Sequence, residues 1–325
     1  MPDKLKVISI GTTPMTRKIN DLLERMECVD FAGVVNLNPE KFASRSNFEP
    51  MYEFKARRPA DIFYTEDINH PDTVAWVKNR NPHIILQSGW SQIWKKEILE
   101  VPELFCVGIH AAPLPDGRGA AILNWKLIEG GGPWGNSMFI MEEKTDMGDI
   151  LDFEPFDLEP RDDVRMAYLK ADRTAIKMVE RTLPKILNGT FNRLSQAGKK
   201  GSRYYKRTPK DGKLEFDWNA DQINNYVRAL THPYPGGYFE TLFGKLIVWT
   251  SEVDEDKSDF EIGTIIEVKQ GKGILIQTAN KTRIWLKSVE PENDIEVWSD
   301  IWANEISIIA SNNLVLGNKY DKCTC

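Results

Sequence analysis

The chain has 325 residues, of which 41% are hydrophobic and 28% charged, and its formal net charge is −6. The length leaves room for two domains, and the absence of any apolar run near about 20 residues excludes a membrane-spanning helix. The acidic balance argues against a broad nucleic-acid surface, because such surfaces depend on Lys and Arg, so it favours a small-molecule substrate.

The amino terminus and the cysteines indicate a cytoplasmic protein. Residues 1–6 are polar and lack the basic region, long apolar core and cleavage site of a signal peptide. The four cysteines form no disulfide framework. Two of them, Cys323 and Cys325, have no second ligand pair nearby, so we expect a loosely held tail there and no metal site.

Short apolar runs alternate with amphipathic segments in the first part of the chain. The runs at 6–10, 31–35, 83–86 and 105–109 predict strands that are buried on both faces, with helices between them at 15–26 and 72–79. This rhythm predicts an α/β fold with a Rossmann-like, mostly parallel sheet. Ligands of such sheets bind outside the carboxyl ends of the strands, where Gln87 and His110 lie. Residues 11–14 lack the glycine spacing of a dinucleotide site.

A change in the hydrophobic pattern of the sequence predicts a second domain. A long helix over 164–187, capped by Asp162 or Asp163, is followed by a polar segment at 196–202 that reads as a linker. Alternating strands then predict a smaller all-β domain, a barrel or a sandwich, at 238–242, 245–249, 263–268, 273–278 and 282–286. We expect domains at 1–202 and 203–310 and a tail at 311–325.

The most unusual local run is Gly-Ile-His-Ala-Ala-Pro-Leu-Pro-Asp-Gly-Arg-Gly at 108–119. In it, His110 ends a strand and a loop stiffened by proline and glycine follows. A later strand at 135–141 leads into the acidic loop at 142–149, which offers a carboxylate that could meet the histidine. By position alone, a structural histidine and a solvated turn aspartate remain open alternatives.

These segments resemble the formyltransferase family, which includes methionyl-tRNA, glycinamide ribonucleotide and sugar N-formyltransferases. The family pattern N-x-H-x-S-L-L-P-x-x-x-G is similar to 108–119, and the family's D-x-G-D is similar to 146–149. Residues 120–125 look like the aminoarabinose-type sugar enzymes, and 206–212 and 228–237 resemble the barrel that these enzymes share with the tRNA enzyme. The resemblance covers roughly residues 5–290 and implies an OB-like barrel as the second domain.

The resemblance implies transfer of a formyl group from N10-formyltetrahydrofolate to an amine, without a metal. An imidazole titrates near neutral pH, so His110 suits the proton transfers, and Asp146 would favour the charged ring and orient it. One departure is Gly108, which stands where the family has an asparagine that holds the formyl oxygen. Such a donor contributes roughly 3 kcal/mol, and Gln87 is the favoured replacement, ahead of Asn124, a backbone N–H or a water.

The resemblance also places the folate and the acceptor. Folate contacts are implied at Gln92, Ile93, Trp94, Ala120, Glu142, Glu143, Lys144, Thr145 and Asp146. Trp90 and Trp94 either stack on the folate or belong to the core. Acceptor contacts are expected from Arg118, Asn124, Trp125, Tyr204 and Arg207.

The expected acceptor is a nucleotide-linked amino-deoxysugar of the UDP-4-amino-4,6-dideoxyhexose type, for surface glycan or nonulosonate synthesis. A dTDP sugar or an amino nonulosonate precursor remains an alternative. Glycinamide ribonucleotide enzymes lack a second barrel, and acidic residues outnumber basic ones over 203–310, which disfavours tRNA. Three rivals stay open: a methionyl-tRNA formyltransferase, a formyltetrahydrofolate hydrolase and a catalytically impaired binding protein. The oligomeric state is also open, a homodimer included.

Overall fold

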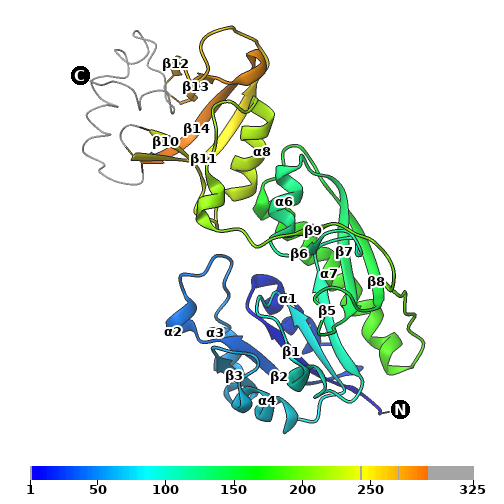
Figure 1. Cartoon of the computed structure of the whole chain (residues 1–325). Helices are drawn as coiled ribbons and strands as arrows, with labels where there is room; N and C mark the ends of the chain where they lie inside the picture. Colours follow the sequence, from blue (N-terminus) through cyan, green and yellow to red (C-terminus); the bar gives the residue numbers. More distant parts are fainter. Residues whose placement is uncertain (1, 242–243, 270, 292–325) are drawn as a thin grey trace. The chain divides into compact units, whose positions relative to one another are not determined.

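The computed structural model describes residues 2–241, 244–269 and 271–291, which form two compact units (Figure 1). The first unit contains residues up to Ile122 together with Gly132–Leu158 and Ala167–Lys206. The second contains Leu123–Gly131, Glu159–Met166 and the described residues from Arg207 onward. The domain limits expected at 202 and 310 stay predictions, and the limit at 310, the tail and its two cysteines lie outside the described residues.

A seven-stranded sheet forms the centre of the first unit, in the order β3-β2-β1-β4-β5-β7-β8. The strands are β1 (Leu5–Gly11), β2 (Val29–Leu37), β3 (Ile62–Thr65), β4 (Ile84–Ser88), β5 (Phe105–His110), β7 (Gly132–Ile140) and β8 (Ile150–Leu158). The first five run parallel, whereas β7 and β8 are antiparallel to their neighbours. The mostly parallel sheet predicted from the unalternating apolar runs is confirmed.

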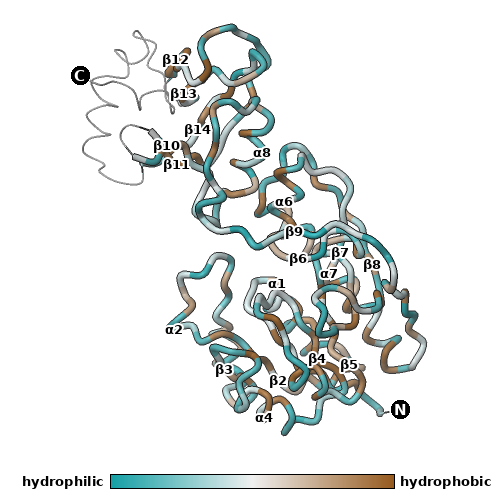
Figure 2. Tube along the Cα trace, in the orientation of Figure 1, coloured by the Kyte–Doolittle hydropathy of each residue, from teal (hydrophilic) through white to brown (hydrophobic). Residues whose placement is uncertain are grey.

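Helices cover both faces of this sheet. Those of the first unit are α1 (Pro14–Leu23), α2 (Pro39–Phe42), α3 (Tyr52–Arg57), α4 (Pro71–Lys78), α5 (Lys96–Leu99) and, from Ala167 onward, α7 (Val164–Leu187), with a 3-10 turn η1 (Pro59–Asp61). Apart from Ile122, α6 (Ile122–Ile128) belongs to the second unit. Apolar side chains of α1 and α7 pack on one face, and those of α4 and α5 pack with Trp90 and Trp94 on the other. Figure 2 shows the hydrophobic colours concentrated along the central strands.

The long helix α7 has the bounds that the sequence predicts. Its cap is Asp163, whose Oδ1 accepts the backbone N–H groups of Arg165 and Met166. Asp162, the other candidate cap, instead accepts the N–H of Glu159 through Oδ2. None of the helices in the described part of the chain has the length and apolar character needed to cross a lipid bilayer.

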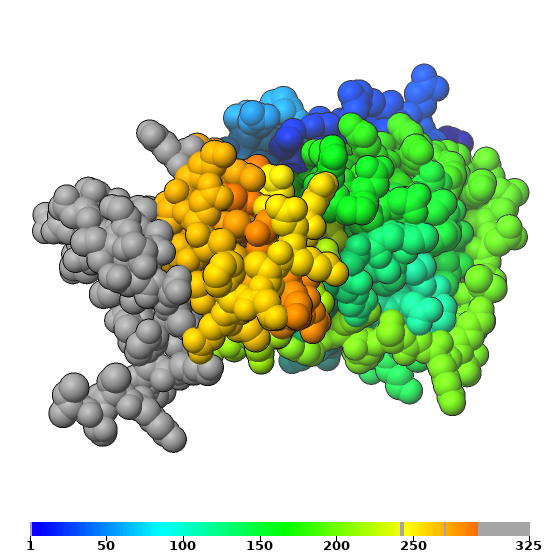
Figure 3. Space-filling view, turned by 90° about the horizontal axis from the view of Figure 1, so that it is seen from above, coloured from blue at the N-terminus to red at the C-terminus, as the bar shows by residue number. Residues whose placement is uncertain are grey.

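The second unit contains an antiparallel sheet in the order β10-β11-β14-β13-β12. Its elements are η2 (Pro209–Gly212), α8 (Ala220–Leu230), β10 (Gly237–Thr241), β11 (Gly244–Asp254), β12 (Ile265–Lys269), β13 (Gly273–Gln277), η3 (Ala279–Lys281) and β14 (Arg283–Pro291). In the space-filling view its yellow to orange residues form one continuous mass (Figure 3). The predicted antiparallel sheet is confirmed, and closure into an OB-like barrel stays a prediction.

The helix α8 is not anticipated by the sequence analysis. Asn219 caps it, with a reciprocal hydrogen bond from Gln222, and Ile223 and Val227 pack on the sheet. Its stability comes from this cap and this packing, because 11 residues are too few for a helix to persist alone. Both the Asn219 cap with Gln222 and the apolar residues at helical spacing, Ala220, Ile223, Val227 and Leu230, are local signals that could have indicated this helix.

The prediction of a linker at 196–202 is wrong. Gln196 is fully buried, and Ser202 accepts the backbone N–H of Gly117 through its hydroxyl and that of Arg118 through its carbonyl. The hydrogen bonds between these two segments continue in the short parallel pair of β6 (Arg118–Gly119) and β9 (Arg203–Tyr204). This polar segment is ordered by hydrogen bonds to the loop after β5, which polar composition alone does not reveal.

Candidate active site

The ring of His110 is held at the carboxyl end of β5. Its Nε2 lies 2.7 Å from the carbonyl oxygen of Gly117, and since a carbonyl only accepts, Nε2 carries the hydrogen. Phe139 on β7 stands edge-on to the imidazole, with ring centroids 6.5 Å apart and planes at 81°. A neutral ring therefore has its unprotonated nitrogen at Nδ1.

Asp146 faces that nitrogen. Its Oδ1 lies 3.9 Å from Nδ1 of His110, and both side chains are largely buried, at 13% and 8% exposure for His110 and Asp146. The other carboxylate oxygen, Oδ2, accepts the backbone N–H of Gly119 at 2.8 Å. The structure thus brings together the two residues that the sequence analysis singled out. The ring is oriented by Gly117 rather than by Asp146, whose separation from the imidazole is longer than a hydrogen bond.

The backbone of Asp146 is left-handed, with φ of 62°, which a non-glycine residue adopts only with support from its surroundings. The support comes from Arg118 and Gln196. Arg118 Nε donates to the Asp146 carbonyl at 3.2 Å, and Gln196 Nε2 donates to the same oxygen at 3.1 Å. Arg118 is only 6% exposed, so its guanidinium is turned toward this turn.

Position 119, next to Arg118, requires glycine because the backbone of Tyr204 lies very close to it. Gly119 has φ of +107°, and a Cβ built on it would lie 2.0 Å from the carbonyl oxygen of Tyr204. Only glycine permits the parallel pairing of β6 with β9 at this distance. The N–H that Asp146 receives is therefore held in place by the strand pairing.

Phe139 fills the space next to Gly108. A Cβ at position 108 would lie 2.7 Å from Cε1 and 2.8 Å from Cζ of that ring. The two residues are direct partners across β5 and β7. Where the resemblance implies an asparagine side chain, this chain thus has a buried aromatic ring, and no amide donor can be restored at position 108 without moving it.

Gln87 lies beside Gly108 on the neighbouring strand β4. Because partners in parallel strands point to the same face, Gln87 is on the face of the sheet that also carries His110, two residues beyond Gly108. One N–H of its amide donates to the carbonyl of Trp90 at 3.0 Å. An amide carries two N–H donors, so this bond does not exhaust its capacity.

The expected folate segments divide into exposed and buried residues. Ile93 is 69% exposed, whereas Trp94 is buried in the core together with Trp90, which favours the core interpretation of both tryptophans. The side chain of Gln92 braces the loop by donating to the Glu66 carbonyl and by accepting from the N–H of Ile68. The remaining positions, Ala120, Glu142, Glu143, Lys144 and Thr145, lie on the loops that follow β6 and β7.

Three of the expected acceptor contacts belong to the second unit. The guanidinium of Arg207 lies over the indole of Trp125, 4.5 Å from the ring centroid. Asn124 is buried, and its Nδ2 donates to the Ala229 carbonyl at 2.7 Å. Tyr204 and Arg118 belong to the first unit. The contacts expected at these five residues stay predictions.

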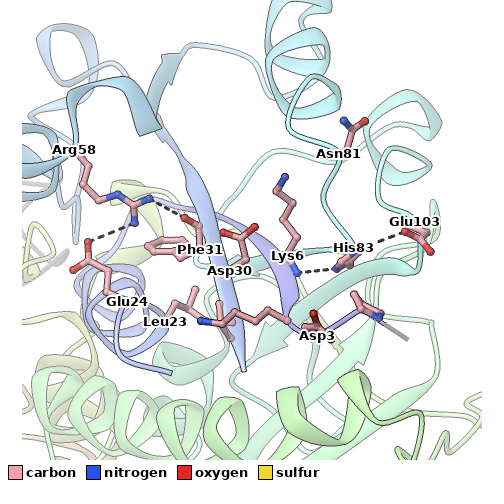
Figure 4. Close-up of a pocket in the computed structure, with 13 residues that line it drawn as sticks. Asp3, Lys6, Leu23, Glu24, Asp30, Phe31, Arg58, Asn81, His83 and Glu103 are labelled. Carbon is pink, nitrogen blue, oxygen red and sulfur yellow. Dashed lines mark hydrogen bonds and ion pairs between the residues drawn. The ribbon is translucent and has the colours of Figure 1, made fainter. Parts of the chain in front are cut away.

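A cavity lies elsewhere in the first unit. It is an open depression of about 1030 Å³ lined by residues such as Lys6, Asp30, Arg58, His83 and Glu103 (Figure 4). Lys6 and Asp30 lie at the amino ends of β1 and β2, opposite to the end of the sheet where His110 lies. Acidic and basic side chains alternate in it, and the backbone N–H of Lys6 is bonded to Nδ1 of His83. The cavity contains none of the predicted site residues.

Comparisons with known proteins identify relatives of this chain. The family model described as formyl transferase matches residues 4–182, and the model of its C-terminal domain matches 206–306. The bifunctional polymyxin resistance protein ArnA of Wigglesworthia glossinidia brevipalpis is 32% identical over 192 residues, which are 59% of this chain and 29% of that protein. The methionyl-tRNA formyltransferase of Bacillus cytotoxicus is 26% identical over 295 residues, which are 88% of this chain and 91% of that protein.

Two solved structures share the fold. The N-formyltransferase of Helicobacter canadensis, in complex with folinic acid and dTDP-3-aminofucose, aligns with a TM-score of 0.64 at 14% identity, over 87% of this chain and 99% of that one. HypX of Aquifex aeolicus, in complex with tetrahydrofolic acid, aligns at 0.60 and 15% identity, over 88% of this chain and 44% of that one. This chain thus spans less than a third of ArnA and less than half of HypX. Since one family model matches more than half of its length, the chain belongs to the formyl transferase family, whose members are enzymes that transfer formyl groups.

Proposed function

We propose that this enzyme moves a formyl group from N10-formyltetrahydrofolate to the amino group of a nucleotide-linked amino-deoxysugar, with His110 as the proton carrier. The observation that carries the proposal is the buried pair of His110 and Asp146, 3.9 Å apart at the carboxyl end of the sheet. The family membership supports it, since the reaction requires a group that accepts and returns one proton.

We assign the proton transfer to one nitrogen of His110. Because Nε2 of His110 is committed to the Gly117 carbonyl, Nδ1 is the nitrogen that accepts a proton from the attacking amine. The amine nitrogen bonds to the formyl carbon, a tetrahedral oxyanion forms, and the protonated ring then returns the proton to N10 as the carbon–N10 bond breaks. The carboxylate of Asp146 stabilises the charged ring between these two steps.

Gln87 is the proposed donor to the oxyanion. Phe139 excludes a side chain at position 108, and Gln87 is the neighbouring amide on the face of the sheet that carries His110. A single donor of this kind is worth about 100-fold to 1,000-fold in rate. Replacement of Gln87 by Leu should therefore lower kcat by a factor in this range.

For the folate, we propose the loops at 92–94 and 142–146 and residue Ala120. The solved N-formyltransferase and HypX bind folinic acid and tetrahydrofolic acid, respectively, which supports a reduced folate as the formyl donor here. Recognition of the folate by main-chain groups does not require a particular side chain, so it is compatible with the exposed side chain of Ile93. The carbonyl of Ile93 accepts from the side chain of Asn69 at 3.0 Å.

For the acceptor, we propose a UDP-4-amino-4,6-dideoxyhexose or a related nucleotide sugar. The N-formyltransferase of Helicobacter canadensis binds dTDP-3-aminofucose, which supports the class of acceptor and keeps a dTDP sugar as an alternative. Trp125 and Arg207 offer an aromatic ring and a cation for a base and a phosphate. Location in the cytoplasm, where activated sugars are made, stays a prediction, as does the oligomeric state.

Methionyl-tRNA is the second candidate acceptor. The Bacillus cytotoxicus tRNA enzyme matches nearly the full length of both chains, which is the observation in its favour. Against it stands the acidic excess over 203–310, since phosphate binding depends on basic side chains. The two acceptors are separated by direct assay.

The experiment incubates the protein with formyltetrahydrofolate and, in separate reactions, UDP- and dTDP-amino sugars or charged initiator tRNA, and follows tetrahydrofolate release. Turnover that requires an amino sugar supports the proposal. Turnover only with tRNA makes the chain a tRNA enzyme, and formate release without any acceptor makes it a hydrolase. Folate binding without turnover in every reaction makes it a binding protein.

A further inference from the structure

We infer that Gln196 is a positioning residue that, together with Arg118, holds the Asp146 turn in place for the transfer reaction. The inference rests on the proposed function, because it concerns the geometry of the His110 and Asp146 pair. Gln196 lies beyond α7, 50 positions after Asp146, in a segment whose composition suggests a linker.

Each polar atom of the Gln196 side chain has a defined partner. Its Nε2 donates to the carbonyl oxygens of Asp146 at 3.1 Å and of Gly148 at 2.7 Å. Its Oε1 accepts from Nη2 of Arg118 at 2.8 Å. The side chain is fully buried, so water cannot take over these bonds. Gln196 thus connects the carbonyls of Asp146 and Gly148 to the side chain of Arg118.

The neighbouring residues Arg118 and Gly119 donate hydrogen bonds to two different groups of Asp146. The side chain of Arg118 donates to the Asp146 carbonyl, and the N–H of Gly119 donates to the Asp146 carboxylate. With Gln196 added, the Asp146 carbonyl accepts two buried donors. The Asp146 backbone therefore cannot turn without breaking the two bonds to its carbonyl, and its carboxylate cannot rotate without losing the N–H of Gly119.

The turn itself needs this support. Asp146 has a positive φ, which a residue with a Cβ adopts at a cost. Gly148 is pressed against β7, since a Cβ there would lie 1.9 Å from the carbonyl oxygen of Ile140. If the Gln196 amide is lost, we expect the Asp146 peptide to relax toward an ordinary backbone conformation and its carboxylate to move away from Nδ1 of His110.

The test compares Gln196→Met with a matched buried glutamine in the second unit. Gln277 is also buried, and its Nε2 also donates to two backbone carbonyls, those of Thr278 at 3.0 Å and Thr282 at 3.1 Å. Gln277→Met therefore reproduces the loss of a buried amide in the unit that does not contain His110 and Asp146. Gln196→Glu, which keeps the acceptor for Arg118 but lacks both donors, serves as the variant that retains size and polarity.

We expect Gln196→Met and Gln196→Glu to lower kcat by about 10-fold to 100-fold while KM for formyltetrahydrofolate changes less than about threefold. In an Asp146→Asn background the same changes should have little further effect, because the charge being positioned is already gone. Gln277→Met should leave kcat within about twofold. An undiminished kcat in the Gln196 variants, or an equal loss over Asp146→Asn, overturns the inference.

A spectroscopic readout separates this inference from the proposed function. The chain has four histidines, so the imidazole ¹⁵N spectrum is simple, and His110→Asn assigns the His110 signals. Gln196→Met should move these signals in the direction in which Asp146→Asn moves them, whether or not any acceptor is turned over. If the wild-type protein transfers no formyl group, the proposed function fails. If the His110 signals do not move, the positioning role fails.

Discussion

The aromatic ring of Phe139 occupies the space into which a side chain at position 108 would project, with Cε1 only 2.7 Å from the position of such a Cβ. Phe139 also stands edge-on to His110. The replacement of the family asparagine by Gly108 is therefore coupled to packing at the partner position on β7, and the two positions should be changed together.

The first prediction concerns this coupling. Gly108→Asn alone should lower the free energy of unfolding by about 1–3 kcal/mol, because it overpacks the space that the ring fills. Phe139→Ala alone should cost about 3–5 kcal/mol. In the double variant, the total loss should be smaller than the sum of the two single losses, as measured by urea unfolding.

Phe105 provides the control for this cycle. It lies on the same strand as Gly108 but packs in the cluster on the other face of the sheet. Phe105→Ala and Gly108→Asn should therefore be additive within about 0.5 kcal/mol. Equal coupling of Gly108→Asn to both phenylalanines would contradict the specific contact with Phe139.

The second prediction concerns the proton carrier. His110→Asn should lower kcat by about 100-fold to 10,000-fold, because asparagine can donate to the Gly117 carbonyl but cannot accept and return a proton. The fold should survive, as checked by thermal unfolding. His70→Asn is the control, because the His70 side chain is 58% exposed. The activity of this variant should match that of the wild type. Normal turnover in the His110 variant would refute the mechanism.

The third prediction concerns a buried cation in the second unit. Arg228 is 7% exposed, and it donates to the carbonyls of Leu127, Glu159 and Asp162. Burial lowers the pKa of this guanidinium. Arg228→Met should lower the free energy of unfolding by about 3 kcal/mol, because it leaves carbonyls without donors.

Arg165→Met is the comparison for that measurement. The Arg165 side chain is 60% exposed and pairs with Asp163 at the start of α7. Its loss should change stability by no more than about 0.5 kcal/mol in urea unfolding. Similar losses for the two arginines would mean that burial of Arg228 contributes nothing.

The fourth prediction concerns acid. Burial acts to raise the pKa of the Asp152 carboxyl, but hydrogen bonds from Arg181 and Thr182 outweigh it, so the pKa is lowered. The pKa of Glu154 is lowered as well, first by Arg181. Because the folded-state pKa values lie below those of the unfolded chain, their stabilisation is present at neutral pH and is lost as the pH falls through the folded-state values.

Arg181→Met should accordingly lower stability by about 1 kcal/mol at pH 7, a figure kept small because Arg181 is 38% exposed to solvent. At pH 3 the difference between variant and wild type should shrink, as followed by urea unfolding at both pH values. A stability difference that grows toward acidic pH would contradict lowered pKa values of Asp152 and Glu154 in the folded protein.

The apolar rhythm of the sequence was sufficient for the central strands β1, β2, β4 and β5 and for α7, whereas β3 and β8 were not predicted. Continuous apolar runs such as 105–109 must be buried on both faces wherever they lie, and they became the central parallel strands. The cap at Asp163 was readable because it acts on residues next to it in the chain. The helix α8 was missed although its cap at Asn219 is equally local; what the local sequence does not show is the sheet of later residues on which Ile223 and Val227 pack.

The sequence by itself placed His110 at the carboxyl end of a strand, and the family resemblance identified Asp146 as its partner. Because β7 runs antiparallel to β5, strand topology alone does not carry the loop after β7 to that end, and the fold must bring Asp146 back to 3.9 Å from His110. Only the tertiary structure decided how they are held. Gly117 orients the ring, Phe139 excludes a side chain at 108, and Gln196 closes the turn. The contacts of Phe139 with position 108 and of Gln196 with Asp146 join residues far apart in the chain, and no local sequence pattern encodes contacts whose partners are determined by the fold.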